Sequence, residues 1–302
     1  MHVAACPYGY VSGPMPLPLN KACEIADFSD PELRGWIRKI FSHDVARFGD
    51  AFPEGVEYRK HWEVAMTAMA FSRCGLLDAN AEVLGVGAGN EPTLFWLTNH
   101  VRRVFATDLY LARGQWKESA NSSMLVQPEA HWPFAWRPRR LVVQHMDALD
   151  LHYEADSFDA IFSSSSLEHF GDWDDVQRAL AEMHRVLRPG GLLCLSTEMR
   201  IRGPGPGLPG VLMFDPEELD RLVSEQGLWA PLDELDTTVS EATLAGAQAF
   251  DKAAADVRSH VKREKHLALH TLRWRSYPHI VLRQGERWWT SVHLALRRRE
   301  PV

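Results

Sequence analysis

A short apolar strand near position 85 leads into closely spaced glycines and an acid: Gly85, Gly87, Gly89 and Glu91. Glycine lets the backbone turn sharply and approach a ligand closely, because it has no Cβ. In open α/β sheets, a strand followed by such a turn forms a nucleotide-binding site at the carboxyl edge of the sheet. Dinucleotide-binding folds place their third glycine where this chain has Asn90, so the spacing disfavours a nicotinamide cofactor.

Two further acids come directly after predicted strands. Asp108 follows a strand predicted at 103–107, and Asp147 follows one predicted at 141–146. An acid at the end of the second strand of a nucleotide-binding sheet accepts hydrogen bonds from ribose hydroxyls. A carboxylate at Asp147 can accept a hydrogen bond from an adenine amino group. The alternative for each acid is a helix cap.

A fourth predicted strand, 158–163, is followed by a serine-rich segment that contains Glu168 and His169. A second substrate would lie at this end of the sheet. A hydroxyl acceptor must lose its proton, and a histidine or a carboxylate usually takes it. We therefore expect His169 to act as a general base with Glu168 as its partner. The alternative is that His169 packs against the next helix or caps it.

Strands and helices alternate through the middle of the chain, which is typical of a parallel sheet with crossover helices. Strands are predicted at 82–86, 103–107, 141–146, 158–163 and 192–197. Helices are predicted at 30–48, 58–77, 92–97, 173–187, from 215 onward, and at 241–268. Residues 280–296 read as an antiparallel hairpin that closes one edge of the sheet.

In order and spacing, these segments resemble the class I S-adenosylmethionine-dependent methyltransferases. The glycine turn resembles the family's first motif, and Met146-Asp147-Ala148 resembles the segment that meets the adenine. Phe158 to Phe162 resembles the family's fourth strand, and Leu187 to Gly191 resembles the turn before its fifth strand. The resemblance implies S-adenosyl-L-methionine as the cofactor and S-adenosyl-L-homocysteine as the product.

The resemblance also implies which residues contact the cofactor: Gly85, Gly87, Gly89, Glu91, Asp108, Met146, Asp147, Ala148 and Ser163. Two positions depart from the family pattern. The family often has an acid where this chain has Gly85, and Glu91 replaces the last glycine of the first motif. Glu91 then either lies near the methionine amino group or is an acid that stabilises the first turn of the next helix.

The fold implied by the resemblance is α/β: a Rossmann-like, doubly wound, mostly parallel seven-stranded sheet with an antiparallel edge strand, plus an N-terminal helical arm. We assign 1–57 to the arm and 58–302 to the methyltransferase domain, with a lid or substrate-side insertion at about 199–277. Weaker site candidates are Tyr58, Lys60, His61 and Glu198. The loop between the second and third strands contains aromatic residues that either cover a ligand or pack beneath the loop: Trp116, Trp132, Phe134 and Trp136.

Composition limits the partners. The net charge of −7 argues against a nucleic acid bound through a broad basic surface. No apolar run reaches the ~20 residues of a membrane span, and the N-terminus has no secretory pattern. The four cysteines are far apart, which fits a reducing compartment. We expect a cytoplasmic protein with no nucleic-acid or membrane partner and no metal, although His266 and His270 share a helix spacing; a homodimer is left open.

The function expected from these features is S-adenosylmethionine-dependent methyl transfer to a small-molecule acceptor. The favoured acceptor is a hydroxyl of a sugar or of a natural product. One alternative is an N-methyltransferase acting on a small molecule, which needs no strong base. Another is a non-catalytic protein that binds the cofactor on the same fold.

Overall fold

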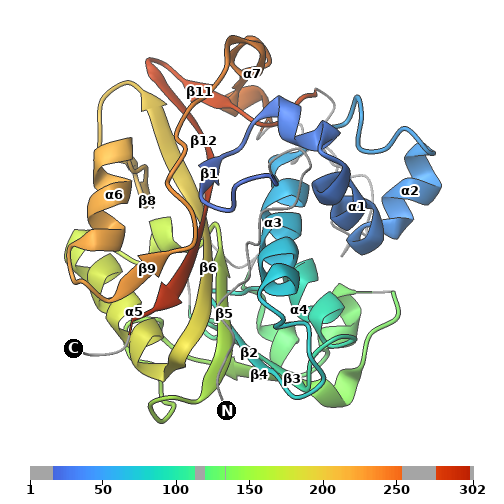
Figure 1. The fold of residues 1–302 in the computed structure, drawn as a ribbon, viewed down its shortest axis with the longest axis vertical. Helices are drawn as coiled ribbons and strands as arrows, with labels where there is room; N and C mark the ends of the chain where they lie inside the picture. The colour runs from blue at the N-terminus through green and yellow to red at the C-terminus, as the bar shows by residue number, and fades with distance from the viewer. Residues whose placement is uncertain (1–15, 113–119, 133, 254–276, 300–302) are drawn as a thin grey trace.

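A computed structural model of the chain describes residues 16–112, 120–132, 134–253 and 277–299. One large sheet runs through the molecule, with helices on both of its faces (Figure 1). The strands of this sheet are β1 (Lys21–Ala22), β2 (Glu82–Val86), β3 (Arg103–Asp108), β4 (Leu141–His145), β5 (Phe158–Ser164), β6 (Leu187–Arg202), β9 (Trp229–Pro231), β10 (Gln248–Ala249), β11 (Leu282–Gln284) and β12 (Arg287–Arg298). A separate small hairpin pairs β7 (Gly207–Leu208) with β8 (Val211–Leu212).

Helices cover the two faces of the sheet and bury a separate apolar core against each. The helices are α1 (Pro31–Ile40), α2 (Ser42–Phe48), α3 (Arg59–Arg73), α4 (Pro92–Leu97), α5 (Trp173–Val186), α6 (Pro216–Ser224) and α7 (Glu241–Ala245). Short 3-10 helices are η1 (Ile25–Ser29), η2 (Ser122–Leu125), η3 (Pro128–His131), η4 (Pro138–Arg140) and η5 (Leu167–His169). Helices α1, α3 and α4 contribute to the core on one face, and α5 and α6 to the core on the other.

The strand order creates a switch point beside β2. Strands β3 and β4 lie on one side of β2, and β5 and β6 lie on the other, all parallel to it. Ligands of open α/β sheets bind outside the carboxyl ends of the strands at such a point. The glycine turn follows β2 and therefore lies there. The mostly parallel, doubly wound sheet predicted from the sequence is confirmed.

The antiparallel part of the sheet is larger than expected. Strand β12 pairs antiparallel with β6 and with β11, so the hairpin predicted within residues 280–296 is confirmed as β11 and β12. Three short strands were not predicted: β1 and β9 also pair with β12, and β10 pairs with β11. Part of the N-terminal segment is therefore bonded to the sheet rather than lying over it as a loose arm.

The sequence marked several helix starts correctly. Asp30 accepts a hydrogen bond from the Leu33 N–H at the start of α1. Asp215 and Glu218 form a reciprocal capping box at the start of α6, with a proline at its first position. Such caps satisfy backbone N–H groups that have no partner inside the helix. An aspartate followed by proline therefore predicts where a helix begins.

Three predicted boundaries were wrong. The helix predicted at 30–48 is broken at Phe41 into α1 and α2, because Phe41 leaves helical geometry (φ −101°, ψ 47°). The strand predicted at 192–197 extends over the whole of β6, because its antiparallel partner β12 is equally long. The helix predicted at 241–268 is interrupted after Ala245: Gly246 packs against Pro278, Gln248–Ala249 pair as β10, and residues 250–253 are helical again. Its part from 254 onward lies outside the described residues.

Gly85 of β2 lies directly against Phe162 of the neighbouring strand β5. A Cβ built on Gly85 would lie 2.8 Å from Phe162 Cζ and 2.9 Å from Ala88 Cβ. Both neighbours are fully buried, so neither can turn toward solvent. A side chain at position 85 would therefore displace the packing between β2 and β5.

We predict that Gly85→Ala lowers the free energy of unfolding by about 1–3 kcal/mol, as overpacking of a buried site does. Gly35→Ala is the matched control, because a Cβ there has nothing within 4 Å. Gly35 lies at an exposed position in the middle of α1. Gly35→Ala should therefore raise the free energy of unfolding by about 0.5–1 kcal/mol. Urea denaturation of both variants measures the difference. A Gly85→Ala protein as stable as the wild type would show that the Phe162 ring moves at no cost.

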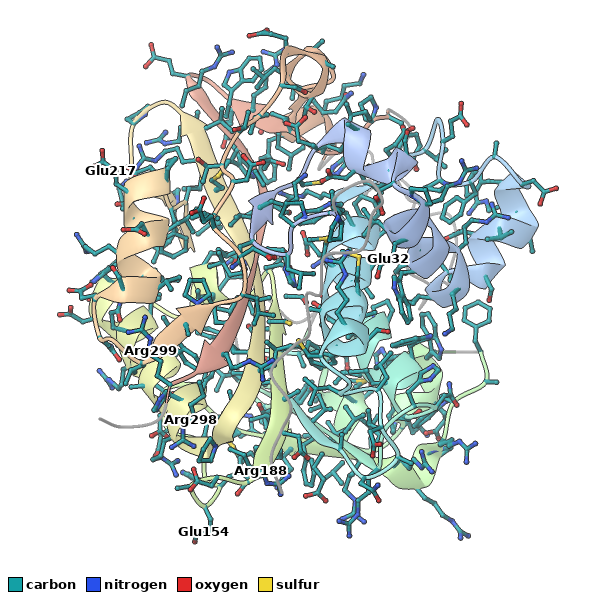
Figure 2. All side chains as sticks on the ribbon, viewed as in Figure 1. Glu32, Glu154, Arg188, Glu217, Arg298 and Arg299 are labelled. Atoms are coloured by element: carbon teal, nitrogen blue, oxygen red, sulfur yellow. The ribbon has the colours of Figure 1, made fainter. Side chains whose placement is uncertain are left out.

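The surface has the ordinary charged character of a protein with an acidic excess. Figure 2 shows Glu154 and Glu217 at the outer edge of the molecule. Within the described parts of the chain, no helix is both long and apolar enough to cross a membrane.

Candidate cofactor and acceptor site

A cavity of about 610 Å³ opens at the carboxyl ends of the parallel strands. The glycine turn after β2 and the segments after β3, β4 and β5 form one part of its wall. The start of α3, strand β6 and the β7–β8 hairpin form the rest. The volume lies in the range of small-molecule sites, and the position is the one that the switch point predicts.

The structure brings most of the predicted cofactor residues to this cavity. Those that line it are Gly87, Gly89, Glu91, Asp108, Met146, Asp147 and Ala148. Gly85 and Ser163 are not among the lining residues. Gly85 is covered by Phe162, and Ser163 is fully buried within β5. Ser164, which points to the other side of the strand, lines the cavity instead.

The glycine turn is held against the segment after β5. Gly87 has a φ of 60°, which glycine adopts without strain. A Cβ on Gly87 would lie 2.7 Å from Ser166 Cβ, so only glycine allows this approach. The Ser166 hydroxyl donates a hydrogen bond of 2.5 Å to the Gly87 carbonyl. The floor of the cavity is therefore a direct contact between two strand ends.

Asp108 connects the end of β3 to the glycine turn. Its carboxylate accepts hydrogen bonds from the Gly89 N–H at 2.8 Å and from the Leu109 N–H at 2.6 Å. Burial raises the pKa of Asp108, although both N–H donors act against that rise. A carboxylate offers about four acceptor positions, so Asp108 keeps capacity for the two hydroxyls of a ribose.

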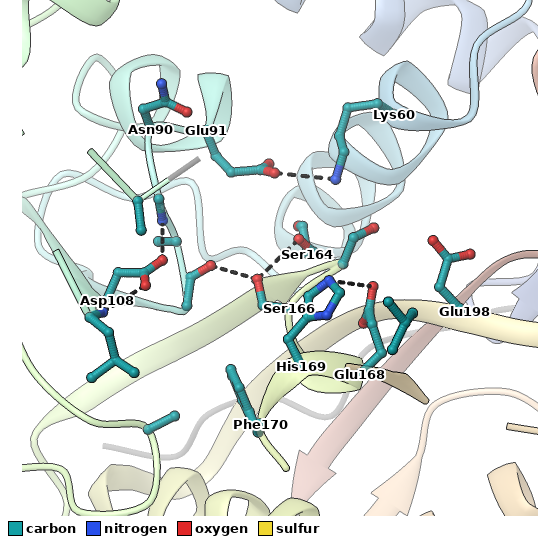
Figure 3. A pocket seen from close by; sticks show the side chains of 18 of the residues that line it. Lys60, Asn90, Glu91, Asp108, Ser164, Ser166, Glu168, His169, Phe170 and Glu198 are labelled. Atoms are coloured by element: carbon teal, nitrogen blue, oxygen red, sulfur yellow. Dashed lines mark hydrogen bonds and ion pairs between the residues drawn. The ribbon is translucent and has the colours of Figure 1, made fainter. Parts of the chain in front are cut away.

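A buried ion-pair network crosses the cavity wall beside the glycine turn (Figure 3). Lys60 Nζ lies 2.6 Å from Glu63 Oε2 and 3.2 Å from Glu91 Oε1. Burial alone would lower the pKa of Lys60, but Glu63 and Glu91 raise it above its usual value. Glu63 also accepts hydrogen bonds from the hydroxyls of Ser165 and Ser291. The ammonium of Lys60 therefore has a fixed position.

A second ion pair lies across the cavity from Asp108. Arg59 donates a hydrogen bond of 2.5 Å to Glu198 Oε2. Arg59 precedes Lys60 at the start of α3, and both residues line the cavity. We did not predict Arg59 from the sequence, because nothing in the helix pattern distinguishes its side chain from that of a solvated arginine. The sequence pointed to this segment only through the neighbouring site candidates Tyr58 and Lys60.

Glu168 lies at the base of the cavity and is 1% exposed. The Thr197 hydroxyl donates a hydrogen bond of 2.8 Å to its Oε2. Burial and the nearby charge of Glu198 raise the pKa of Glu168 to about 8. Glu168 therefore holds a proton at neutral pH.

His169 faces the cavity beside Glu168 (Figure 3). Its Nδ1 lies 2.9 Å from the Gly210 carbonyl of the hairpin between β7 and β8. A carbonyl only accepts hydrogen bonds, so Nδ1 carries the hydrogen and the lone pair of the neutral ring is on Nε2. Nε2 lies 4.0 Å from Glu168 Oε1. Burial lowers the pKa of His169, which keeps the ring neutral at neutral pH.

Other candidates lie away from the cavity. His61 belongs to α3 and is buried, with Nε2 3.5 Å from Asp44 Oδ2. Trp132 stacks on Phe95 with ring centroids 5.9 Å apart, and Phe134 and Trp136 pack against the same core. Trp116, His266 and His270 lie outside the described residues. No group of His, Cys, Asp or Glu side chains within the described parts could hold a metal ion.

The lining fits S-adenosylmethionine, the cofactor implied by the resemblance. Its sulfonium is a cation, and acids outnumber bases around the cavity. The lining acids are Glu91, Asp108, Asp147, Glu168 and Glu198; the lining bases are Arg59 and Lys60. The close approach at Gly87 leaves room for a ligand where a side chain would otherwise project.

We predict that Glu168 makes the protein less stable as the pH rises from about 4.5 to about 8. The folded protein holds a proton there that the unfolded chain releases, so unfolding becomes easier by up to about 1.4 kcal/mol per pH unit. Urea denaturation across this range should show that Glu168→Gln removes this component of the slope. Glu154→Gln, at the surface, is the control. An unchanged slope in Glu168→Gln would contradict the buried, protonated carboxyl.

Comparison with known proteins supports the same interpretation. Residues 84–195 match a family model described as a methyltransferase domain. A 2-methyl-6-phytyl-1,4-hydroquinone methyltransferase of rice is 29% identical, covering 45% of this chain and 36% of that protein. The 27-O-demethylrifamycin SV methyltransferase of Amycolatopsis mediterranei is 27% identical, covering 55% and 61% respectively. The chain thus spans between about a third and three-fifths of the length of these curated relatives.

Solved structures share the fold at low sequence identity. A putative sarcosine dimethylglycine methyltransferase from Galdieria sulphuraria has a TM-score of 0.50 and 15% identity, covering 80% of this chain and 86% of that one. The [4+2]-cyclase SpnF also has a TM-score of 0.50, with 18% identity and 93% and 99% coverage. At this identity the likeness concerns the fold alone.

Proposed function

We propose that this chain, which belongs to the class I S-adenosylmethionine-dependent methyltransferases, transfers a methyl group to a hydroxyl of a small molecule. S-adenosyl-L-methionine is the cofactor, and when bound it supplies a methyl group on a cationic sulfur that a nucleophile can displace. The product is S-adenosyl-L-homocysteine. The remaining chemistry is the positioning and deprotonation of the acceptor, which falls to the side chains of the cavity.

The cofactor residues are assigned by the cavity wall to which they belong. Asp108 would hold the ribose hydroxyls, since its carboxylate is fixed by two backbone N–H groups. Met146, Asp147 and Ala148 would hold the adenine. The glycine turn, with Glu91, would lie beside the methionine end.

The observation that carries the proposal is the orientation of His169. The Gly210 carbonyl fixes the hydrogen on Nδ1, so Nε2 offers a lone pair in the cavity that Asp108 and Glu91 also line. The lowered pKa keeps that lone pair available at neutral pH. A neutral imidazole at this place can remove the proton of a hydroxyl as its oxygen attacks the methyl group.

The two acids near His169 have different roles in this proposal. Glu168 already holds a proton at neutral pH, so it does not compete with His169 for the acceptor proton. Glu198 raises the pKa of His169 by its negative charge, and it therefore stabilises the imidazolium that forms when the proton is transferred. Different surroundings thus give neighbouring carboxyl groups different protonation states.

The acceptor end of the cavity has an apolar wall. Its members come from the β7–β8 hairpin and from the region of β10 and β12: Leu208, Val211, Met213, Phe250 and Trp289. An apolar wall gains free energy by burying apolar substrate surface. We therefore favour a natural-product hydroxyl on a largely apolar body over a free sugar. The names of the rifamycin and hydroquinone methyltransferases are consistent with this choice.

Two alternatives remain, each with a distinct outcome. An amine acceptor carries its own lone pair, so an N-methyltransferase would not need His169 as a base. The second alternative is a protein that binds the cofactor on the same fold without transferring its methyl group. Fold alone does not imply activity.

The proposal is tested by incubating the protein with S-adenosylmethionine and an ultrafiltered extract of small metabolites. We expect S-adenosylhomocysteine to accumulate only when both are present, as measured by mass spectrometry. The methylated metabolite, gaining one methyl group, identifies the acceptor. Binding of S-adenosylmethionine without any product would favour the non-catalytic alternative.

We predict that His169→Ala lowers kcat by about 10²–10⁴-fold, the usual contribution of a general base, with little change in the affinity for the cofactor. The wild-type rate should be independent of pH above about 6.5, because the pKa of His169 is lowered below this usual value. His152→Ala is the control, since this histidine is exposed and its Nε2 lies 3.2 Å from the exposed carboxylate of Asp150. Full turnover by His169→Ala would instead favour an amine acceptor.

A further inference from the structure

The glycine turn has few backbone N–H groups left for a ligand. The N–H of Ala88 donates to the Thr107 carbonyl at 3.0 Å, and the N–H of Gly89 donates to Asp108. The N–H of Glu91 donates back to the Ala88 carbonyl at 3.1 Å. The next residue is a proline, which has no N–H. A carboxylate bound beside this turn therefore meets few backbone donors there and gains from a side-chain donor.

An ammonium group of a ligand bound beside the turn needs a carboxylate as its partner. Position 85 cannot supply it, because a Cβ there would lie 2.8 Å from the Phe162 ring. Asp108 is directed to the other end of the turn by its two backbone donors. Of the acids that line the cavity, Glu91 is the one that belongs to the turn itself.

Lys60 and Glu91 each have one hydrogen-bonding position to offer. A lysine ammonium has three donor hydrogens; Glu63 and Glu91 take two of those of Lys60. Glu91 Oε1 faces Lys60, while Glu91 Oε2 is buried and has no hydrogen-bond partner among the residues that the structure describes. An unsatisfied buried acceptor costs free energy, so Glu91 Oε2 gains by accepting a hydrogen bond from a ligand.

Glu63 fixes this pair in place from behind. It is fully buried and accepts hydrogen bonds from Ser165 and from Ser291 of β12. Its charge is balanced by Lys60, which holds the pKa of Glu63 below its usual value despite burial. The Lys60 ammonium is therefore positioned before any ligand arrives, which lowers the entropic cost of binding.

We propose that Lys60 and Glu91 together recognise the amino-acid end of the cofactor, with Lys60 donating to its carboxylate and Glu91 Oε2 accepting from its ammonium. An ion pair is complementary to a zwitterion, because each of its charges meets the opposite charge. The proposal rests on the proposed use of S-adenosylmethionine. It assigns to Lys60, at the start of α3, a contact with the carboxylate that the backbone N–H groups of the glycine turn would otherwise make.

The test compares ligands with and without the amino-acid end by isothermal titration calorimetry. S-adenosylhomocysteine has this end, and 5′-methylthioadenosine lacks it. Lys60→Met and Glu91→Gln should each weaken S-adenosylhomocysteine binding by about tenfold or more and change 5′-methylthioadenosine binding by less than about twofold. Lys39→Met, at the exposed end of α1, is the matched control and should leave both affinities unchanged.

A third ligand separates the roles of the two residues. Decarboxylated S-adenosylmethionine keeps the ammonium and lacks the carboxylate. Lys60→Met should therefore bind it about as well as the wild type does, whereas Glu91→Gln should bind it about tenfold more weakly. The reverse pattern would exchange the two assignments and overturn the proposal as stated.

Other outcomes also have definite meanings. Equal losses for S-adenosylhomocysteine and 5′-methylthioadenosine would show that Lys60 and Glu91 support the structure only. No loss for either variant would show that the backbone binds the amino-acid end. Because Lys60→Met leaves Glu63 buried without its partner, 5′-methylthioadenosine binding also reports whether that variant is folded, and Glu91→Gln provides an independent test. A wild-type protein that binds none of the three ligands would contradict the proposed function instead.

Discussion

The close approach of β2 to β5 is the constraint on which the rest of the site depends. Gly85 lies beneath the Phe162 ring, and Gly87 approaches Ser166 so closely that neither position has room for a Cβ. This packing brings the glycine turn and the serine-rich segment after β5 together as the floor of one cavity. It also excludes any side chain from position 85, so the charges that a zwitterionic ligand requires have to come from neighbouring elements.

Those charges come from segments that are far apart in the sequence. Lys60 and Glu63 belong to helix α3, Glu91 follows the glycine turn, and Ser291 belongs to β12. Each buried charge in this network has an opposite charge or a hydrogen-bond donor beside it, as the high cost of burying an isolated ion requires. The network therefore joins helix α3, the parallel part of the sheet and its antiparallel part at the cavity.

The protonation states at the acceptor end arise from the same principle. Glu198 remains paired with Arg59. Glu168 lies 4.0 Å from the neutral ring of His169, and burial together with the nearby charge of Glu198 raises its pKa so that it takes up a proton. His169 is held in one tautomer by a carbonyl of the β7–β8 hairpin. The hairpin thus contributes both an apolar wall and the orientation of the proposed base.

The sequence alone determined the parallel sheet, the helix caps at Asp30 and Asp215, and most of the residues that line the cavity, because these depend on local periodicity and on short-range spacing. Glu168 and His169 were also found from their position after a strand. The tertiary structure decided the rest. Burial of Gly85 and Ser163, the interruption of the predicted helix at Gly246 and the Lys60–Glu63–Glu91 network all depend on contacts between distant segments. No local pattern of residue types records which side chain another element will meet.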